Sequence, residues 1–317
     1  MQTYYDALQA DPAHPALARA YREIYPPGST FKVVTTTGAL DTGVATPDSD
    51  YADLKFYVPP QTTNPINNFG GKPCGGTLED AFRRSCNWVF AKLGVDMGER
   101  FVPATEAFGF NLAPNLDVSP GAVASLGLRA DTFRQDNPSF ALAGIGQGPI
   151  ASTPLQMALV AAGIANRGVV MEPHLGRRVE DRQGRVVRRV APQAWRRATS
   201  PETAATITEF MVSVVRNGTG TAAQIPGVTV AGKTGTAAIC RQYAIASASK
   251  FPQESWKLIS FLGGKDKDGK YYVANRWWVE QGLNFGYKSM GETAEVKKSV
   301  EGWGDLDAYN KVVTNAS

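Results

Sequence analysis

The sequence predicts an α+β fold, because stretches with helical spacing and stretches with strand spacing both occur along its 317 residues. Pro26-Pro27-Gly28 interrupts any preceding element, so a helix is expected to begin at Ser29. The segment 77–94, TLEDAFRRSCNWVFAKLG, has apolar residues at spacings that suit one or two short helices, and Thr77 with Asp80 is typical of a capping box.

Strands are expected in two later segments. Val228 and Val230 alternate as in a strand that ends just before Lys233. The basic segment between Arg177 and Arg197 favours a solvated β-hairpin that turns at Gln183-Gly184 over a nucleic-acid site, because aromatic and basic residues do not interleave there. Contact of this hairpin with an anionic membrane surface stays open.

Composition narrows the class of protein. With 43% apolar residues the chain can bury a core, and its length allows one large domain or two. The net charge of +4 is mild. No apolar run approaches the ~18 residues of a membrane span, and the first residues do not resemble a signal peptide, so the chain as written is expected to be soluble.

Histidine and cysteine are scarce. His14 and His174 are the only histidines, which leaves little for a Ser-His-Asp triad or a His-rich metal site. A serine-type enzyme would therefore use another base, and neither a metal nor a cofactor is expected. The three cysteines cannot all pair, so the redox compartment stays open, and a disulfide between Cys74 and Cys86 is one option.

The stretch YPPGSTFK, residues 25–32, places a lysine one helical turn after a serine. At i and i+3 the two side chains share a helix face, and the helix N-terminus favours an oxyanion. Ser29 with Lys32 can thus be a lysine-activated nucleophile. Alone, the pair is more typical of a capping serine followed by a solvated lysine.

Two further short motifs follow in order. Ser85-Cys86-Asn87 is expected at a break between two helices, where Ser85 and Asn87 can point into a cleft or simply cap the second helix. Lys233-Thr234-Gly235-Thr236 places a cation and two hydroxyls around a small residue, which suits a peptide carboxylate lying along a strand. A nucleotide-binding loop is rejected, because the earlier glycine of that motif is missing.

Ser-x-x-Lys, Ser-x-Asn and Lys-Thr-Gly in this order are the motifs of penicillin-recognising serine enzymes. From about Asp6 to Ala237 the chain resembles the transpeptidase domain of class B penicillin-binding proteins, most closely the actinobacterial kind. NFGGKPCGGTLEDAFRRSCN, GIGQGPIASTPLQMALVAAGIANRG and VVRNGTGTAA carry the resemblance between the motifs. It implies a serine β-lactamase/transpeptidase-like fold, an antiparallel sheet flanked by helices, here with an incomplete sheet.

The resemblance implies a peptidoglycan D,D-transpeptidase that cross-links stem peptides through a serine acyl-enzyme and binds β-lactam antibiotics. The implied catalytic residues are Ser29 as nucleophile, Lys32 as base, Ser85 as proton relay and Asn87 as the holder of the substrate amide. The implied substrate-binding residues are Lys233, Thr234, Gly235 and Thr236, and the N–H groups of Ser29 and Thr236 would form the oxyanion hole.

Two other kinds of protein share these motifs, the class A β-lactamases and the β-lactam sensors. A class A β-lactamase would need an E-x-x-L-N stretch between the second and third motifs, and none occurs. A non-catalytic β-lactam sensor shares all three motifs and stays an alternative. Full-length relatives act at the extracytoplasmic face of the cell membrane and pair with a membrane glycosyltransferase, whereas this chain shows no signal or anchor.

The two ends depart from the family pattern. Only 28 residues precede Ser29, so the first strands of the catalytic sheet are expected to be absent. We expect residues 1–240 to form the transpeptidase domain and residues 241–317 to form a divergent C-terminal segment. That segment is either the closing strands or, as we favour, a fragment of an extracellular sugar-binding protein of an ABC transporter, which would make the chain a fusion of two gene fragments. The activity of such a chain stays open, and an inactive fusion fragment is an alternative to the transpeptidase.

Overall fold

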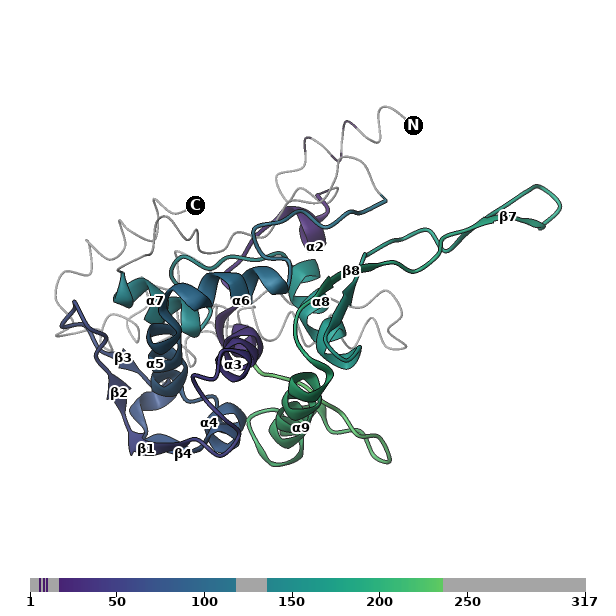
Figure 1. Ribbon diagram of the computed structural model, residues 1–317. Coiled ribbons are helices and arrows are strands. Elements are labelled where there is room, and N and C mark those ends of the chain that lie inside the picture. The colour runs from purple at the N-terminus through teal and green to yellow at the C-terminus, as the bar shows by residue number, and fades with distance from the viewer. Residues whose placement is uncertain (1–5, 7, 9, 11–16, 118–135, 236–317) are drawn as a thin grey trace, which may run out of the picture. The chain divides into compact units, whose positions relative to one another are not determined.

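The computed structural model describes residues 6, 8, 10, 17–117 and 136–235. All of them belong to the first of two units into which the chain divides, Met1–Ala237 (Figure 1). Some of the sequence predictions concern residues outside the described ranges. These are His14, Thr236 and residues 241–317.

The central element is a helix that is buried on all sides. A 3-10 turn, η1 (Gly28–Phe31), leads directly into α3 (Lys32–Asp41), so helical structure begins one residue before the expected Ser29 and the α-helix itself begins three residues after it. Every residue of α3 from Lys32 to Ala39 is buried. Its threonines stay satisfied because their hydroxyls donate to carbonyl oxygens, as Thr36 does to Lys32 and Thr35 to Gly144 at 2.9 Å.

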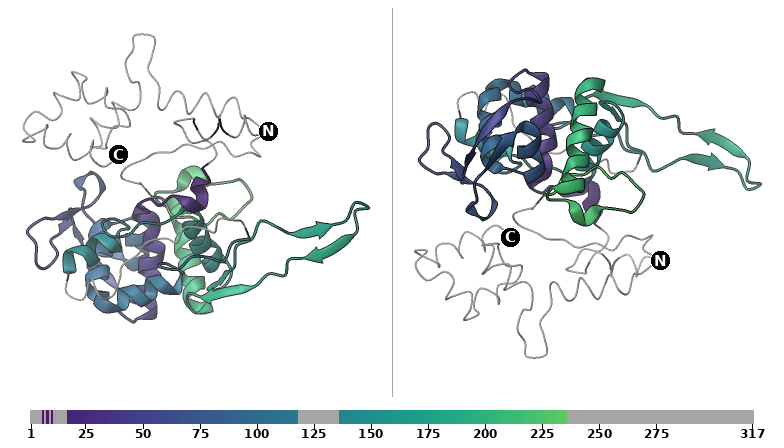
Figure 2. Two further views of the ribbon diagram at one scale, coloured as in Figure 1. Left: turned by 90° about the horizontal axis from the view of Figure 1, so that it is seen from above. Right: turned by 90° about the horizontal axis from the view of Figure 1, so that it is seen from below.

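The other helices surround α3 (Figures 1 and 2). They are α2 (Arg19–Arg22), α4 (Leu78–Arg84), α5 (Asn87–Met97), α6 (Phe101–Ala107), α7 (Asn137–Gly144), α8 (Pro154–Ala165) and α9 (Pro201–Asn217), with short 3-10 turns η2 (Phe69–Gly71), η3 (Gly98–Arg100) and η4 (Thr221–Ala223). The predicted capping box of α4 is confirmed, since Thr77 Oγ1 accepts from Asp80 N and the Asp80 carboxylate accepts from Thr77 N.

The strands form antiparallel pairs. Within the described residues these are β1 (Asp50–Leu54) with β4 (Cys74–Thr77), β2 (Phe56–Tyr57) with β3 (Ile66–Asn67), β5 (Val169–Met171) with β8 (Ala194–Arg197), and β6 (Arg178–Glu180) with β7 (Val186–Arg189). Helices and antiparallel strands together confirm the α+β class. The hairpin predicted to turn at Gln183-Gly184 is the pair β6–β7.

The strand predicted over residues 228–230 is not formed in the part of the chain that the structure describes. The only bridge there joins Val228 to Ile225, three residues earlier. Val228 is exposed, so the alternation of the valines does not mark a buried face. A strand needs a neighbouring backbone to satisfy its N–H and C=O groups, and alternation alone does not supply one.

In the part of the chain that the structure describes, an aromatic core and not a large sheet holds the helices together. Phe31, the last residue of η1, packs edge-to-face on Phe110 with ring centres 5.3 Å apart, and it also contacts Phe101. Phe82 of α4 contacts Phe90 of α5 and Phe210 of α9. Each buried side chain of this size contributes roughly 2–3 kcal/mol through the hydrophobic effect.

Across residues 17–117 and 136–235, none of the helices has the length and apolar character that crossing a membrane would require.

Two glycines bring the turn at Ser29 against the loop that follows α7. Gly28 N donates to Gly146 O at 2.8 Å. Gly146 has φ +72°, and a Cβ placed on it would lie 2.1 Å from Gly28 O and 2.7 Å from Phe31 Cβ. Only glycine therefore allows the two backbones to approach this closely.

We predict that Gly146→Ala lowers the free energy of unfolding by about 2 kcal/mol more than Gly184→Ala does, because a new side chain at 146 must displace the Ser29 turn. Gly184 is a matched control, since it has φ +76° but no atom within 4 Å of its would-be Cβ. Chemical denaturation of both variants measures the difference. Equal losses would show that the contact with Gly28 contributes nothing.

Candidate active site

Ser29 lies half-buried in the 3-10 turn η1, directly ahead of α3. Gly28 has φ +56°, and Thr30 Oγ1 donates to Pro27 O at 2.7 Å, which holds the turn closed. Lys32 is the first residue of α3. Within the described residues the Ser29 hydroxyl forms no hydrogen bond with Lys32, although contacts between catalytic groups often tighten only when substrate is bound.

The Lys32 amine is completely buried yet well partnered. Its Nζ lies 2.9 Å from the Ser85 carbonyl oxygen, 3.2 Å from Ser85 Oγ and 2.7 Å from Asn87 Oδ1. It also lies 5.2 Å from the centre of the Phe90 ring. The second predicted motif is thus in direct contact with the first.

Burial, and secondarily the charge of Lys233, holds the pKa of Lys32 well below its ordinary value of 10.5. A neutral amine has two N–H donors and one lone pair. The Ser85 carbonyl and the Asn87 carboxamide oxygen can accept the two donors, which leaves the lone pair to accept from the Ser85 hydroxyl. The surroundings of Lys32 therefore fit a neutral base.

Ser85 lies between two helices, at the break that the sequence predicted. It ends α4 with φ 59° and ψ 43°, and α5 begins at Asn87. A non-glycine residue in this left-handed region costs roughly 1–3 kcal/mol and needs support from its surroundings. The neighbouring Cys86 supplies part of that support, because it is disulfide-bonded to Cys74 of β4.

The Asn87 carboxamide has a hydrogen-bond partner on its nitrogen as well as on its oxygen. Its Nδ2 donates to Asn67 O in β3 at 2.9 Å, while its Oδ1 accepts from Lys32. The carboxamide orientation is therefore determined by one donor and one acceptor. Asn67 was not among the predicted site residues, because a backbone carbonyl carries no signal in the sequence.

Lys233 completes a chain of polar contacts. Its Nζ donates to Ser85 Oγ at 2.9 Å and to Thr234 O at 3.0 Å, and it lies 5.7 Å from the centre of the Phe82 ring. Burial lowers the pKa of Lys233 from 10.5 to about 7. Ser85 Oγ thus lies between two amines, Lys32 and Lys233, both with lowered pKa values.

Thr234 and Gly235 lie against the other segments of the site. A Cβ on Gly235 would lie 2.6 Å from Thr30 Cγ2, so the third motif passes directly beside the turn that carries Ser29. The Thr234 and Thr219 hydroxyls lie 2.6 Å apart. Thr219 was not predicted as a site residue, although its stretch VVRNGTGTAA was noted; Thr236 lies outside the described residues.

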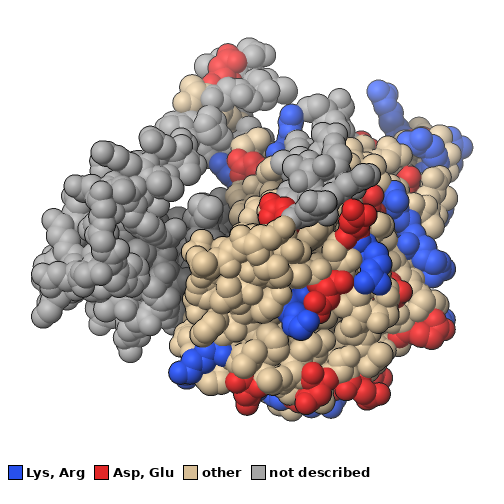
Figure 3. Space-filling view, turned by 60° about the vertical axis from the view of Figure 1, so that its left-hand side comes forward, with Lys and Arg blue, Asp and Glu red and all other residues tan. Residues whose placement is uncertain are grey.

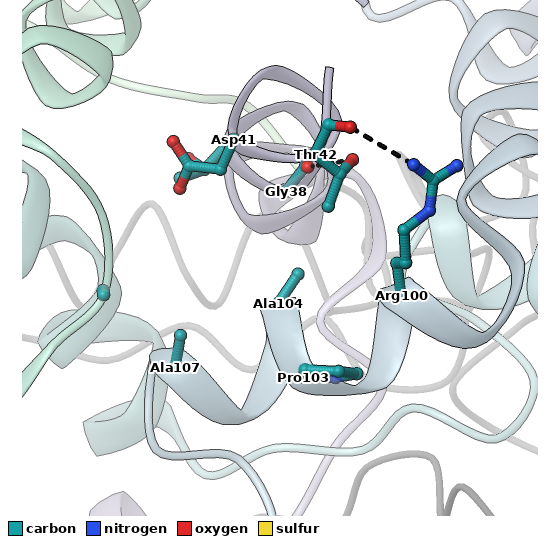
Figure 4. A pocket seen from close by; sticks show the side chains of 9 residues that line it. Gly38, Asp41, Thr42, Arg100, Pro103, Ala104 and Ala107 are labelled. Carbon is teal, nitrogen blue, oxygen red and sulfur yellow. Dashed lines mark hydrogen bonds between the residues drawn. The ribbon is translucent and has the colours of Figure 1, made fainter. Parts of the chain in front are cut away.

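A pocket of about 320 Å³ lies elsewhere, at the opposite end of α3. Figure 4 shows it between the end of α3, with Gly38 and Thr42, and the facing helix α6, with Pro103 and Ala104. Arg100 Nη1 donates to Thr42 O at 3.2 Å across one side of it. None of the predicted site residues lines this pocket.

The chain matches the model of the penicillin binding protein transpeptidase domain over residues 2–286. It is 39% identical over 239 residues to the peptidoglycan D,D-transpeptidase PbpA of Mycolicibacterium smegmatis, covering 74% of this chain and 47% of the relative. PbpA of Mycobacterium tuberculosis is 37% identical, with 73% and 46% covered. The chain therefore spans a little under half the length of these relatives.

Solved structures of similar proteins point to the same family. The D,D-transpeptidase domain from Eggerthella lenta has a TM-score of 0.68 and 34% identity, with 74% of this chain and 59% of that chain covered. The imipenem acyl-enzyme complex of penicillin-binding protein A from M. tuberculosis has a TM-score of 0.66 and 35% identity, with 74% and 53% covered. The predicted resemblance to the actinobacterial kind of transpeptidase domain and its serine β-lactamase/transpeptidase-like fold are confirmed. The chain belongs to the penicillin-binding protein transpeptidase domain family.

Proposed function

We propose that this chain carries the catalytic domain of a peptidoglycan D,D-transpeptidase that binds penicillin. The observation that carries the proposal is the contact chain from Lys32 through Ser85 to Lys233, which lies beside the Ser29 turn. The relatives support it, because the two PbpA proteins are named D,D-transpeptidases and penicillin-binding protein A has been captured as an acyl-enzyme.

The first step is acylation of Ser29. Its Oγ attacks the carbonyl carbon of the penultimate D-alanine of a stem peptide, and the proton passes to the neutral Lys32 amine. Because burial lowers the pKa of that amine well below its ordinary value, Lys32 is suited to act as a base. The resulting tetrahedral oxyanion lies at the beginning of α3, where the backbone N–H of Ser29 can donate to it.

The second step is loss of the terminal D-alanine. The Ser85 hydroxyl donates its proton to the leaving nitrogen and takes one from Lys32, so no net charge is left on Ser85. Its contacts with both lysines suit this relay. The peptide C–N bond breaks and leaves the acyl group as an ester on Ser29. An amine of a neighbouring stem peptide then attacks this ester, the C–O bond to Ser29 breaks, Ser29 regains a proton from the amine, and the new amide closes a cross-link.

The substrate is held by its terminal carboxylate and its amide. The Lys233 cation and the hydroxyls of Thr234 and Thr219 would bind the carboxylate, and Thr236 would join them. Asn87 Nδ2 has a second N–H besides the one donated to Asn67, and this proton would hold the substrate amide. A β-lactam would acylate Ser29 in the same way.

The proposal includes the location of the domain in the cell and its protein partner. We place the domain at the extracytoplasmic face of the cell membrane, where stem peptides are found, with a membrane glycosyltransferase as its partner. A β-lactam sensor without turnover would use the same three motifs, but the transpeptidase names of the relatives favour the catalytic role. The origin of residues 241–317 stays a prediction, although the family match reaches residue 286.

Incubation with a fluorescent penicillin is expected to add one penicilloyl group to the chain, and Ser29→Ala is expected to abolish the adduct, because it removes the attacking oxygen. Intact-mass spectrometry measures the adduct. Ser213→Ala on α9 is the control, since it removes a hydroxyl of the same kind away from the site. An adduct retained by Ser29→Ala, or none on the folded unmodified chain, would contradict the proposal.

The second-order rate constant for acylation is expected to fall as the pH rises through about 7, because the Lys233 cation loses its proton there and with it the attraction for the carboxylate. On the acidic side the rate is expected to fall when Lys32 becomes protonated, and because burial lowers the pKa of Lys32, that limb lies at a lower pH than an ordinary lysine would give.

Lys233→Arg tests this assignment, because a guanidinium keeps its charge throughout the pH range. The variant is expected to acylate more slowly but without the fall near pH 7. Stopped-flow fluorescence across the pH range measures both profiles. A fall near pH 7 that persists in Lys233→Arg would assign the alkaline limb to another group.

A further inference from the structure

The hairpin of β6 and β7, which we call the arm (residues 177–190), stands apart from the catalytic site. Figures 1 and 2 show it projecting away from the helices of the first unit. Every residue of both strands is exposed, including Val179 and Val187, which are 46% and 67% accessible. Nothing in the proposed catalysis uses it.

The arm carries a charge as large as that of the whole chain. Its six arginines and two carboxylates leave a net charge of +4, which equals the formal net charge of all 317 residues. On the face of the body that Figure 3 shows, in contrast, acidic and basic side chains are interspersed. Both carboxylates are already paired within the arm, Glu180 with Arg178 and Asp181 with Arg185. The remaining arginines have no ion pair among the described residues; they are Arg177, Arg182, Arg188 and Arg189.

The strand register brings like charges together. Arg178 lies directly opposite Arg189, and Arg188 lies opposite Val179. Like charges directly opposite each other destabilise an antiparallel pair, by a few tenths of a kcal/mol to about 1 kcal/mol. Two neighbouring guanidinium groups are, however, well suited to carboxylates. The register therefore favours a partner that brings negative charge.

The arm also has open edges. Among the described residues β6 and β7 pair only with each other, so the outer N–H and C=O groups of each strand have no ladder partner. A two-stranded hairpin is marginally stable alone and gains from a third strand. Positive side chains on open edges repel a second copy of the arm but accept an acidic strand.

We propose that the arm binds an extended acidic polypeptide segment, which adds to an open edge as a third strand. Its carboxylates would lie on the face of Arg178 and Arg189 and neutralise Arg189, which is unpaired among the described residues, and its alternate apolar residues would lie on the opposite face, beside Val179. An anionic membrane surface fits less well, because the tip, Glu180–Gly184, carries both carboxylates and no apolar residue.

The probe is a fluorescent peptide of about ten residues that alternates glutamate and valine, and its binding is followed by fluorescence anisotropy at low salt. Arg178→Glu with Arg189→Glu is expected to weaken binding at least tenfold. Arg22→Glu with Arg216→Glu is the matched control, because it makes the same change of charge at exposed sites outside the arm and should alter binding less than twofold. Equal weakening by both pairs would overturn the proposal, since net charge alone would then explain the binding.

Two further measurements separate the alternatives. The same peptide with one central valine replaced by proline keeps its charge but cannot complete a strand ladder, and it should bind at least tenfold more weakly. Equal binding of the two peptides would overturn strand addition. Arm-dependent binding to phosphatidylglycerol vesicles without peptide binding would assign the arm to a membrane and overturn the proposal. Acylation by fluorescent penicillin, unchanged in all variants, checks that they fold.

Discussion

The burial of the Lys32 amine is the constraint on which the rest of the site depends. A charged ammonium without partners in apolar surroundings would cost several kcal/mol, so this side chain is tolerated only with a lowered pKa and satisfied hydrogen bonds. The carbonyl and hydroxyl of Ser85 and the carboxamide of Asn87 supply those bonds. Because α3 must meet the α4–α5 turn at these distances, the position of Ser29, one turn earlier, is determined as well.

Small residues allow the segments to meet without distorting the backbone. Gly146 lets the loop after α7 contact the turn at Gly28, and Gly235 lets the third motif pass Thr30. Gly94 and Gly144 do the same for α5 and α7, where a Cβ on either would lie within 2.3 Å of a carbonyl oxygen of the other helix. The geometry of the site thus depends on backbone contacts as much as on the catalytic side chains themselves.

The local features could be predicted from the sequence because their causes are local. Prolines and a glycine before Ser29, the Thr77–Asp80 box and the turn at Gly184 each act within a few residues, and each was predicted correctly. The strand over 228–230 was not, because strand formation depends on a distant partner. The contacts of Thr219 and Asn67 could not be predicted either, since they join segments far apart in the chain.

The left-handed conformation of Ser85 shows how these contacts act together. At φ 59° the backbone of Ser85 is strained, and no local contact of a serine side chain offsets that strain. The turn therefore keeps this conformation because its surroundings determine it. Both lysines contact Ser85 Oγ, the disulfide ties Cys86 to β4, and Asn87 is bound to β3. Loosening any one of them would allow Ser85 to relax and would separate the two lysines from their shared hydroxyl. The strained turn holds the Ser85 hydroxyl between Lys32 and Lys233, and this position supports the proton relay that we propose for Ser85.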